Sequence, residues 1–329
     1  MKTIGINGFG RIGRNFLKAV LLKDDLQVTV INDLADVNTL MHLFKYDSVH
    51  GILKLNFSID NNVVSFENGK KIIFYSERNP ELIPWGKHNV DIVIESTGLF
   101  LTLDKANLHL KGGAKKVILS APAKDTSIKT IVMGINNQFI TESDLILSNA
   151  SCTTNSAAPL ISIISELCKI ESAYISTVHS YTSDQRLHDA PHNDLRRARA
   201  ASHSIIPTST GAAKALVKIF PELEGKFEGG AVRVPTLNGS ITDLTLIVDK
   251  NLNVDEINFA FKNAASNKFK GILEYTSDPI VSNDIIGNTH STIYDSALTV
   301  VNGKMIKIFG WYDNETGYSN RLVDLCLIF

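Results

Sequence analysis

The chain of 329 residues contains only three cysteines, at positions 152, 168 and 326. Three cysteines are too few for a disulfide framework, and a reducing cytoplasm is the compartment that such a composition indicates. No stretch approaches the roughly 18 uninterrupted apolar residues of a membrane-spanning helix. The start of the chain also lacks the apolar core of a signal peptide. We therefore expect a cytoplasmic protein that does not act at a membrane.

An excess of charge is missing as well. The 33 lysines and arginines almost balance the 34 aspartates and glutamates, which leaves a net charge of −1. Such a chain has no global field to recruit nucleic acid or an anionic membrane. Hydrophobic residues make up 44% and charged residues 20%, as in ordinary globular proteins. Because 329 residues exceed a single ordinary core, we expect two domains.

The stretch Ser148–Asn155 surrounds Cys152 with polar side chains. An apolar run before it, residues 144–147, predicts a strand, and the spacing of apolar residues over 156–169 predicts a helix. Free backbone N–H groups and the positive end of the helix dipole favour a thiolate at such a junction. An arbitrary cysteine is more often a buried structural residue. The polar neighbours favour a nucleophile here.

A glycine motif, Gly8-Phe9-Gly10-Arg11-Ile12-Gly13, lies near the start of the chain. It follows a predicted strand, residues 3–7, and precedes a predicted helix, residues 14–22. A second predicted strand, residues 27–31, is followed by Asp33, 20 positions after the last glycine. A lone GxGxxG motif is weak, but this context predicts a Rossmann dinucleotide-binding fold.

The residues of this motif suit a dinucleotide. Gly8 permits a tight turn, Gly10 lets the backbone approach a pyrophosphate, and Gly13 lets the helix pack on the strand. The helix N-terminus supplies N–H donors to the phosphates. Asp33 is expected to accept hydrogen bonds from the adenosine ribose and to repel a 2′-phosphate, which favours NAD over NADP.

Further dense apolar runs predict more parallel strands, at residues 90–95, 116–120, 130–134 and 145–147. Thr97 and Ser120 follow the ends of two of them, where ligand contacts belong in an open α/β sheet. Residues 47–75 predict an antiparallel excursion with turns at 61–62 and 68–69.

In the second half, a predicted strand at residues 174–178 is followed by His179. A lone histidine at a strand end is more often structural, but pairing with a cysteine at a helix N-terminus favours a catalytic base. The sequence does not show that the two side chains meet.

The long basic segment 184–204 is open to several interpretations: nucleic acid, a partner subunit, small phosphates or a solvated surface. Near-zero net charge and the lack of interleaved aromatics argue against nucleic acid. Thr182, Arg197, Thr210 and Arg233 together indicate a site for a phosphorylated small molecule, because hydroxyls at a helix start and an arginine among apolar residues both suit an anion.

Six motifs, in order, resemble the phosphorylating glyceraldehyde-3-phosphate dehydrogenases over essentially the whole chain. They are Asn7-Gly8-Phe9-Gly10-Arg11-Ile12-Gly13-Arg14, Lys45-Tyr46-Asp47-Ser48-Val49-His50-Gly51, Ala150-Ser151-Cys152-Thr153-Thr154-Asn155, Ser209-Thr210-Gly211-Ala212-Ala213-Lys214, Arg233-Val234-Pro235-Thr236 and Trp311-Tyr312-Asp313-Asn314-Glu315.

The resemblance implies a role for each matching residue. Cys152 is the nucleophile and His179 the base, and Asn314 holds the nicotinamide amide. The adenosine and pyrophosphate contacts are Arg11, Ile12, Asp33, Arg78 and Ser120. The residues for the substrate phosphate and inorganic phosphate are Ser151, Thr153, Thr182, Arg197, Thr210, Gly211 and Arg233.

The resemblance also implies the architecture: an α/β chain with a Rossmann NAD-binding domain (1–150 plus 313–329) and an α+β catalytic domain with a mostly antiparallel sheet (151–312). It implies glyceraldehyde 3-phosphate and inorganic phosphate as substrates, no metal, and a homotetramer. Ser156 and Thr316 depart from the family's usual cysteine and tryptophan. Two alternatives stay open: an erythrose-4-phosphate dehydrogenase, and a binding protein that retains the fold.

Overall fold

The structure is a computed structural model that describes residues 1–329 and forms two compact units. Unit 1 consists of residues 1–131, 137–150 and 319–329, and unit 2 of residues 132–136 and 151–318. The predicted domain bounds stay a prediction; the units differ from them in assigning 132–136 and 313–318 to unit 2. Asp313 belongs there because its carboxylate accepts hydrogen bonds from Asn238 Nδ2 and the Gly287 N–H, each at 2.8 Å.

Unit 1 is built on one sheet with the order β10-β11-β9-β8-β1-β2-β7-β6-β5. Its strands are β1 (Lys2–Asn7), β2 (Leu26–Asn32), β5 (Phe57–Asp60), β6 (Val63–Phe66), β7 (Lys71–Tyr75), β8 (Ile92–Glu95), β9 (Lys116–Leu119), β10 (Lys129–Thr130) and β11 (Ile146–Ser148). The run β7-β2-β1-β8-β9-β11 is parallel and has the strand order of a Rossmann fold. This arrangement confirms the predicted fold.

The antiparallel excursion is also confirmed, since β5 pairs with β6 and β6 with β7 in antiparallel fashion. The predicted strand at residues 130–134 is wrong beyond Thr130. Val132 donates its N–H to Asn136 Oδ1 at 2.7 Å, and its carbonyl accepts from the Ile135 N–H. These turn bonds replace a strand ladder.

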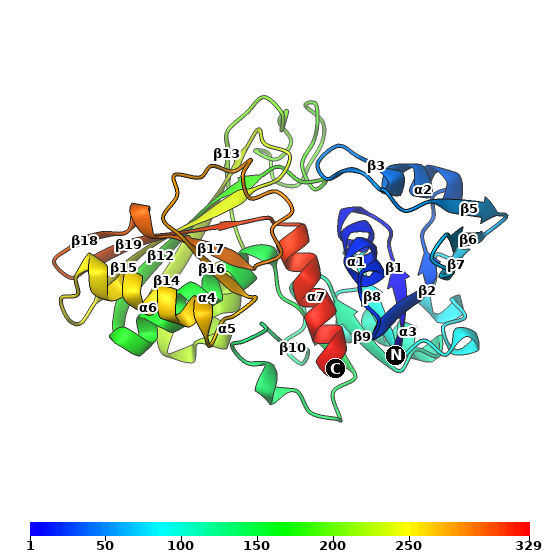
Figure 1. Ribbon diagram of the computed structural model, residues 1–329, viewed down its shortest axis with the longest axis horizontal. Helices are drawn as coiled ribbons and strands as arrows, with labels where there is room; N and C mark the ends of the chain where they lie inside the picture. Colours follow the sequence, from blue (N-terminus) through cyan, green and yellow to red (C-terminus); the bar gives the residue numbers. More distant parts are fainter. The chain divides into compact units, whose positions relative to one another are not determined.

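Unit 1 also contains helices α1 (Arg11–Leu21), α2 (Val37–Lys45) and α3 (Leu103–Lys111) and the short pair β3 (Tyr46–Asp47) and β4 (Gly51–Ile52) (Figure 1). Three short 3-10 helices lie at Pro80–Leu82, Gly86–His88 and Asn137–Phe139. Helix α1 begins three residues before the predicted start, because the end of the glycine motif is already helical. The glycine motif follows the carboxyl end of β1, Asp33 follows that of β2, and Thr97 follows that of β8. The residues predicted to bind the dinucleotide thus lie at one edge of the sheet.

Unit 2 contains a second sheet with the order β13-β14-β12-β15-β19-β17-β16, and β18 also pairs with β19. Its strands are β12 (Ile170–Ser180), β13 (Ile206–Thr208), β14 (Phe227–Val234), β15 (Ser240–Val248), β16 (Leu273–Thr276), β17 (Thr292–Asp295), β18 (Val300–Asn302) and β19 (Met305–Tyr312). Only β12–β14 and β16–β17 are parallel pairs, so the sheet is mostly antiparallel, as predicted.

Helices α4 (Cys152–Leu167), α5 (Ala212–Ile219) and α6 (Val254–Ser266) lie along one side of this sheet (Figure 1). Strand β15 alternates buried and half-buried residues along its whole length, because only one face packs against the helices. The last helix, α7 (Thr316–Ile328), starts in unit 2 and continues in unit 1. None of the helices combines the length and the apolar character needed to span a membrane.

Candidate active site

The backbone before Cys152 is tightly defined. Ala150 adopts a left-handed conformation with a φ of 56°, which is uncommon for a residue with a Cβ. Ser151 then caps helix α4, since its Oγ accepts the Thr154 N–H at 3.1 Å. The helix consequently begins at Cys152, four residues before the predicted start. Cys152 occupies the first helical position, where backbone N–H groups have no intrahelical acceptor.

The structure brings Cys152 and His179 together, with Sγ 3.4 Å from Nε2. His179 lies within β12 and is only 4% exposed. Its Nδ1 is 2.6 Å from the Ser180 carbonyl oxygen, which can only accept a hydrogen bond. We therefore assign the ring proton to Nδ1, which leaves the Nε2 lone pair directed at the thiol. This is the geometry of a nucleophile with its base.

Arg233 lies beside His179. Strands β12 and β14 are in parallel register with His179 opposite Arg233. Arg233 Nη1 donates to the Ser180 carbonyl at 3.0 Å and lies 2.9 Å from His179 Nδ1; because both nitrogens carry protons, they share this carbonyl as acceptor and do not bond each other. Its Nε is buried with no hydrogen-bond partner. A buried guanidinium with an unsatisfied donor suits an anionic ligand.

Burial and Arg233 both act on the ionisation of the pair. Burial raises the pKa of the Cys152 thiol, and the positive charge of Arg233 acts in the opposite direction. Burial, with Arg233 second, lowers the pKa of His179 to about 3. Both dominant effects favour a neutral thiol beside a neutral imidazole. In this state the Nε2 nitrogen is unprotonated and faces the thiol.

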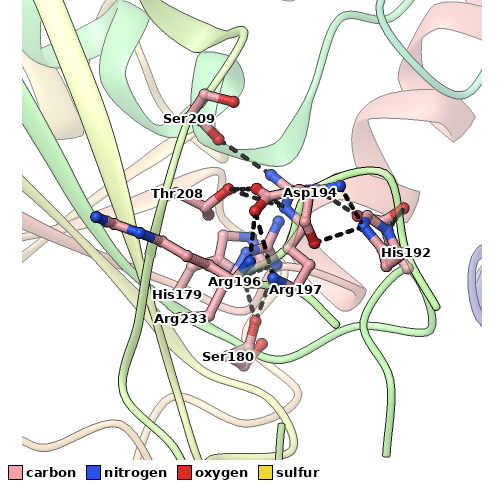
Figure 2. Close-up of polar contacts among 10 residues, drawn as sticks. His179, Ser180, His192, Asp194, Arg196, Arg197, Thr208, Ser209 and Arg233 are labelled. Carbon is pink, nitrogen blue, oxygen red and sulfur yellow. Dashed lines mark hydrogen bonds and ion pairs between the residues drawn. The ribbon is translucent and has the colours of Figure 1, made fainter. Parts of the chain in front are cut away.

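The basic segment folds against the end of β13 through Asp194 (Figure 2). Asp194 accepts from Thr208 Oγ1 at 2.7 Å, and Arg197 donates to Thr208 Oγ1 at 2.9 Å and to the Ser209 carbonyl at 3.1 Å. Arg197 also pairs with Asp184. Its guanidinium is thus held within the loop, while its charge still lowers the pKa of His179.

The other residues predicted to bind phosphate are spread over unit 2. Thr210 Oγ1 accepts the Ala212 N–H at 3.2 Å, and Gly211 is the N-cap of α5, with nothing within 4 Å of the place where a Cβ would stand. Thr153 is 4% exposed, and its hydroxyl bonds Tyr312 Oη at 2.9 Å. Thr182 is half-buried just after β12. The roles of all these residues stay predictions.

Asn314 has a fixed orientation. Its Oδ1 accepts from Ser180 Oγ and from Ser240 Oγ, each at 2.9 Å. With the amide oxygen bonded to both hydroxyls, Nδ2 points the other way. A side chain held in this way presents a donor of defined direction, which suits recognition of a carboxamide oxygen.

In unit 1 the glycine motif has the features that a dinucleotide needs. Gly8 has a φ of 92°, and a Cβ on Gly13 would come within 2.3 Å of the Gly8 carbonyl oxygen. A Cβ on Gly10 would meet nothing within 4 Å, so the space over this turn is open. No side chain caps the first turn of α1, which begins with Arg11 and Ile12. The motif therefore fits a pyrophosphate at a helix N-terminus.

The remaining predicted cofactor residues follow strand ends in unit 1. Asp33 lies just after β2, where its Oδ2 accepts the Phe9 N–H at 2.7 Å. Thr97 follows β8 and Ser120 follows β9, and both are half-buried. Arg78 is exposed in the loop after β7.

Comparison with known proteins identifies these features. Residues 2–103 match the NAD binding domain of glyceraldehyde 3-phosphate dehydrogenase, and residues 151–314 match its C-terminal domain. The chain belongs to the glyceraldehyde-3-phosphate dehydrogenase family. The glyceraldehyde-3-phosphate dehydrogenase of Geobacillus stearothermophilus is 54% identical over 325 residues, which cover 98% of this chain and 96% of the relative.

Two further relatives are similar to nearly the whole chain. The glyceraldehyde-3-phosphate dehydrogenase of Streptomyces coelicolor is 53% identical over 326 residues (98% of this chain, 96% of the relative). Glyceraldehyde-3-phosphate dehydrogenase 1 of Bacillus cereus is 51% identical over 327 residues (99% and 97%). The family resemblance inferred from the motifs is thereby confirmed, and the cofactor of this family's first domain is NAD.

Sequence reasoning about this family member missed several residues that organise the site. Ser180 and Ser240 orient Asn314, and Tyr312 Oη joins Thr153 and Thr177 Oγ1, at 2.9 and 2.8 Å. Tyr312 lies in the last of the six motifs, but the sequence alone indicates no function for it. The serines gave no local signal, because their partner is more than 70 residues away in the chain.

Ser156, the departure from the usual family cysteine, is fully buried. Its hydroxyl lies 2.9 Å from Thr242 Oγ1 and 3.3 Å from Thr292 Oγ1. A hydroxyl cluster thus fills the position one helical turn after Cys152.

Proposed function

We propose that this chain is an NAD-dependent phosphorylating glyceraldehyde-3-phosphate dehydrogenase, which converts glyceraldehyde 3-phosphate and inorganic phosphate to 1,3-bisphosphoglycerate in glycolysis. The observation that carries the proposal is the Cys152–His179 contact of 3.4 Å at the start of α4. A thiol beside an imidazole whose other nitrogen is fixed is the arrangement for covalent catalysis on a carbonyl.

The reaction begins with attack of Cys152 Sγ on the aldehyde carbon. The thiol proton passes to His179 Nε2 and then to the carbonyl oxygen, which gives a thiohemiacetal. The Cys152 N–H, at the first helical position, and the protonated imidazole stabilise the negative charge that develops on this oxygen. Because the imidazole is neutral before the reaction, its Nε2 can take up the thiol proton.

Oxidation of the thiohemiacetal to a thioester needs a base for the hydroxyl proton, and Nε2 is again the group in place. Bound NAD supplies the hydride acceptor. Asn314 holds the nicotinamide amide through its fixed Nδ2 donor, and Asp33 accepts from the adenosine ribose. Arg11, Ile12, Arg78, Thr97 and Ser120 make the remaining cofactor contacts in this proposal.

Inorganic phosphate then attacks the thioester carbon, the C–S bond breaks, and the acyl phosphate leaves as the thiol reforms. Arg233 and Thr182 bind the phosphate of the substrate, and Arg233 Nε gains the acceptor that it lacks. Ser151, Thr153, Arg197, Thr210 and Gly211 serve the substrate and inorganic phosphate.

The test is the formation of NADH from glyceraldehyde 3-phosphate in the presence of phosphate. Cys152→Ala should abolish it, whereas Cys168→Ala, which changes a buried cysteine near the end of α4, should retain it. Activity should also require added phosphate. Phosphate-independent formation of the free acid would contradict the phosphorylating reaction.

Steady-state rates with erythrose 4-phosphate as the competing aldehyde would separate the triose enzyme from an erythrose-4-phosphate dehydrogenase, and we expect the triose to be preferred.

We further propose that the protein works in the cytoplasm as a homotetramer. Sedimentation equilibrium should give four times the chain mass of 36.1 kDa.

A further inference from the structure

A polar cluster is buried at the carboxyl ends of β1, β2 and β8 in unit 1. Glu95, the last residue of β8, and His109, in α3, form its centre, and both are 0% exposed. We infer that Glu95 and His109 are positioning residues for the dinucleotide. This inference rests on the proposed binding of NAD to unit 1.

Glu95 holds two of the strand ends together. Its Oε1 accepts from the Thr97 N–H at 2.8 Å and from the Thr97 hydroxyl. Its Oε2 lies 2.7 Å from Asn7 Nδ2 and 2.9 Å from His109 Nε2, and both nitrogens donate to it. A buried carboxylate with this many donors is stabilised in one orientation.

The cluster reaches the third strand end through Asn7. Asn7 Oδ1 accepts from Asn32 Nδ2 at 2.8 Å, at the end of β2. Asn32 Oδ1 in turn accepts the Glu77 N–H at 2.8 Å, and its Nδ2 donates to the Glu77 carbonyl at 2.9 Å. The network therefore fixes the start of the loop that carries Arg78.

The glycine motif rests directly on the segment that Glu95 holds. Ser96 Oγ donates to the Gly8 carbonyl at 2.7 Å, and a Cβ on Gly8 would lie only 2.8 Å from the Thr97 nitrogen. With no free space between these backbones, a shift of Thr97 must displace Gly8. Glu95 thus fixes the position of the glycine turn at which the pyrophosphate is proposed to bind.

Packing alone does not explain a histidine at this buried position in α3. Its Nδ1 is buried without a hydrogen-bond partner, which costs stability. Its ring contacts those of Trp85 and Phe100, each with a centroid distance of 5.9 Å. An apolar residue would suit these neighbours, so the contribution of His109 is the Nε2 donor to Glu95.

Loss of this donor should loosen the loops without disturbing the chemistry in unit 2, because preorganisation of a binding loop contributes to affinity. His109→Leu should raise the Kd and KM for NAD about ten-fold, with kcat at saturating NAD unchanged. His109→Gln keeps an amide donor at a similar reach and should restore most of the affinity. The rate of Cys152 alkylation by iodoacetamide without NAD should be equal in all variants.

Val117→Ala is the matched control, since it removes packing from the cluster under α3 without touching a polar atom. It should lower the unfolding temperature and leave the KM for NAD unchanged. If His109→Leu and Val117→Ala change the KM equally, or if His109→Gln is as weak as His109→Leu, the role is structural and the inference is wrong. If the wild type binds no NAD by calorimetry, the proposed function fails instead.

Discussion

At the scale of single residues, the burial of His179 changes its ionisation and, with it, the stability of the fold at low pH. Its ring is almost fully buried, beside a guanidinium, and its pKa is lowered to about 3 from 6.5. Between these two values the unfolded chain binds a proton that the folded chain does not, so stability falls as the pH falls through 6.5. A neutral imidazole in the folded state is therefore maintained at the expense of acid stability.

We expect His179→Gln to flatten the dependence of the free energy of unfolding on pH. The wild type should lose about 2 kcal/mol between pH 8 and pH 5 through this group, at 1.36 kcal/mol per pH unit below 6.5. Urea unfolding of both proteins at several pH values measures the difference. Parallel curves would show that His179 titrates alike in the folded and unfolded chains.

A second prediction concerns Asp33. Asp33→Ala removes the negative charge at the end of β2 and should raise the ratio of kcat/KM for NADP to that for NAD about ten-fold. Asp36→Ala removes the same charge three residues later, where the side chain caps α2 by accepting the Thr39 N–H at 2.9 Å. This control should leave the cofactor ratio unchanged. Equal ratios in all three proteins would show that other residues decide the preference.

At the scale of elements, two helix N-caps have different consequences. Ser151 caps α4 directly before Cys152, and Asn253 caps α6 in a capping box with Glu256. Ser151→Ala and Asn253→Ala should each cost about 1 kcal/mol of stability. Only Ser151→Ala should also lower kcat/KM, because it frays the turn that places the thiol. Thermal unfolding and steady-state kinetics on both variants measure this, and equal activities would contradict it.

The elements also show what the sequence predicts well. Helix α1 is predicted over residues 14–22 and observed as Arg11–Leu21, because its apolar spacing marks the body of the helix but not its first turn. The start of α4 was predicted four residues late, since a polar first turn has no apolar period and is set by the Ser151 cap. The segment after Thr130 was predicted as strand, and an Asn136 side-chain bond turns it instead.

The candidate site was predictable as residue types but not as contacts. The glycine motif and the polar surroundings of Cys152 are local patterns, so both could be found in the sequence. The approach of Cys152 to His179 spans 27 positions and depends on the packing of α4 on the sheet. Glu95 and His109 gave no signal, because each looks like an ordinary residue in its own element.

At the scale of the whole molecule, two lysines of unit 1 form hydrogen bonds with the backbone of the last residues of the chain. Lys2 Nζ donates to the carbonyls of Cys326 and Leu327, each at 3.0 Å, and Lys116 Nζ donates to the Phe329 carbonyl at 2.7 Å. The Lys116 ammonium also lies 4.2 Å from the centre of the Phe329 ring. These bonds join α7 to β1, and the residue after α7 to β9, so they connect the end of the chain to the strands of the dinucleotide fold.

We expect Lys116→Met to destabilise unit 1 by roughly 1–2 kcal/mol, because it removes a charged donor and a cation–π contact. Lys115→Met is the matched control: Lys115 is 69% exposed and pairs with Asp91 on the surface, a contact worth little. NAD at one fixed concentration, one hundred times the wild-type Kd, should stabilise both variants by the same increment of about 2.7 kcal/mol, since ligand binding adds to folding by mass action. Urea unfolding with and without NAD measures both effects. A smaller increment in Lys116→Met would mean that the attachment of α7 also shapes the NAD site.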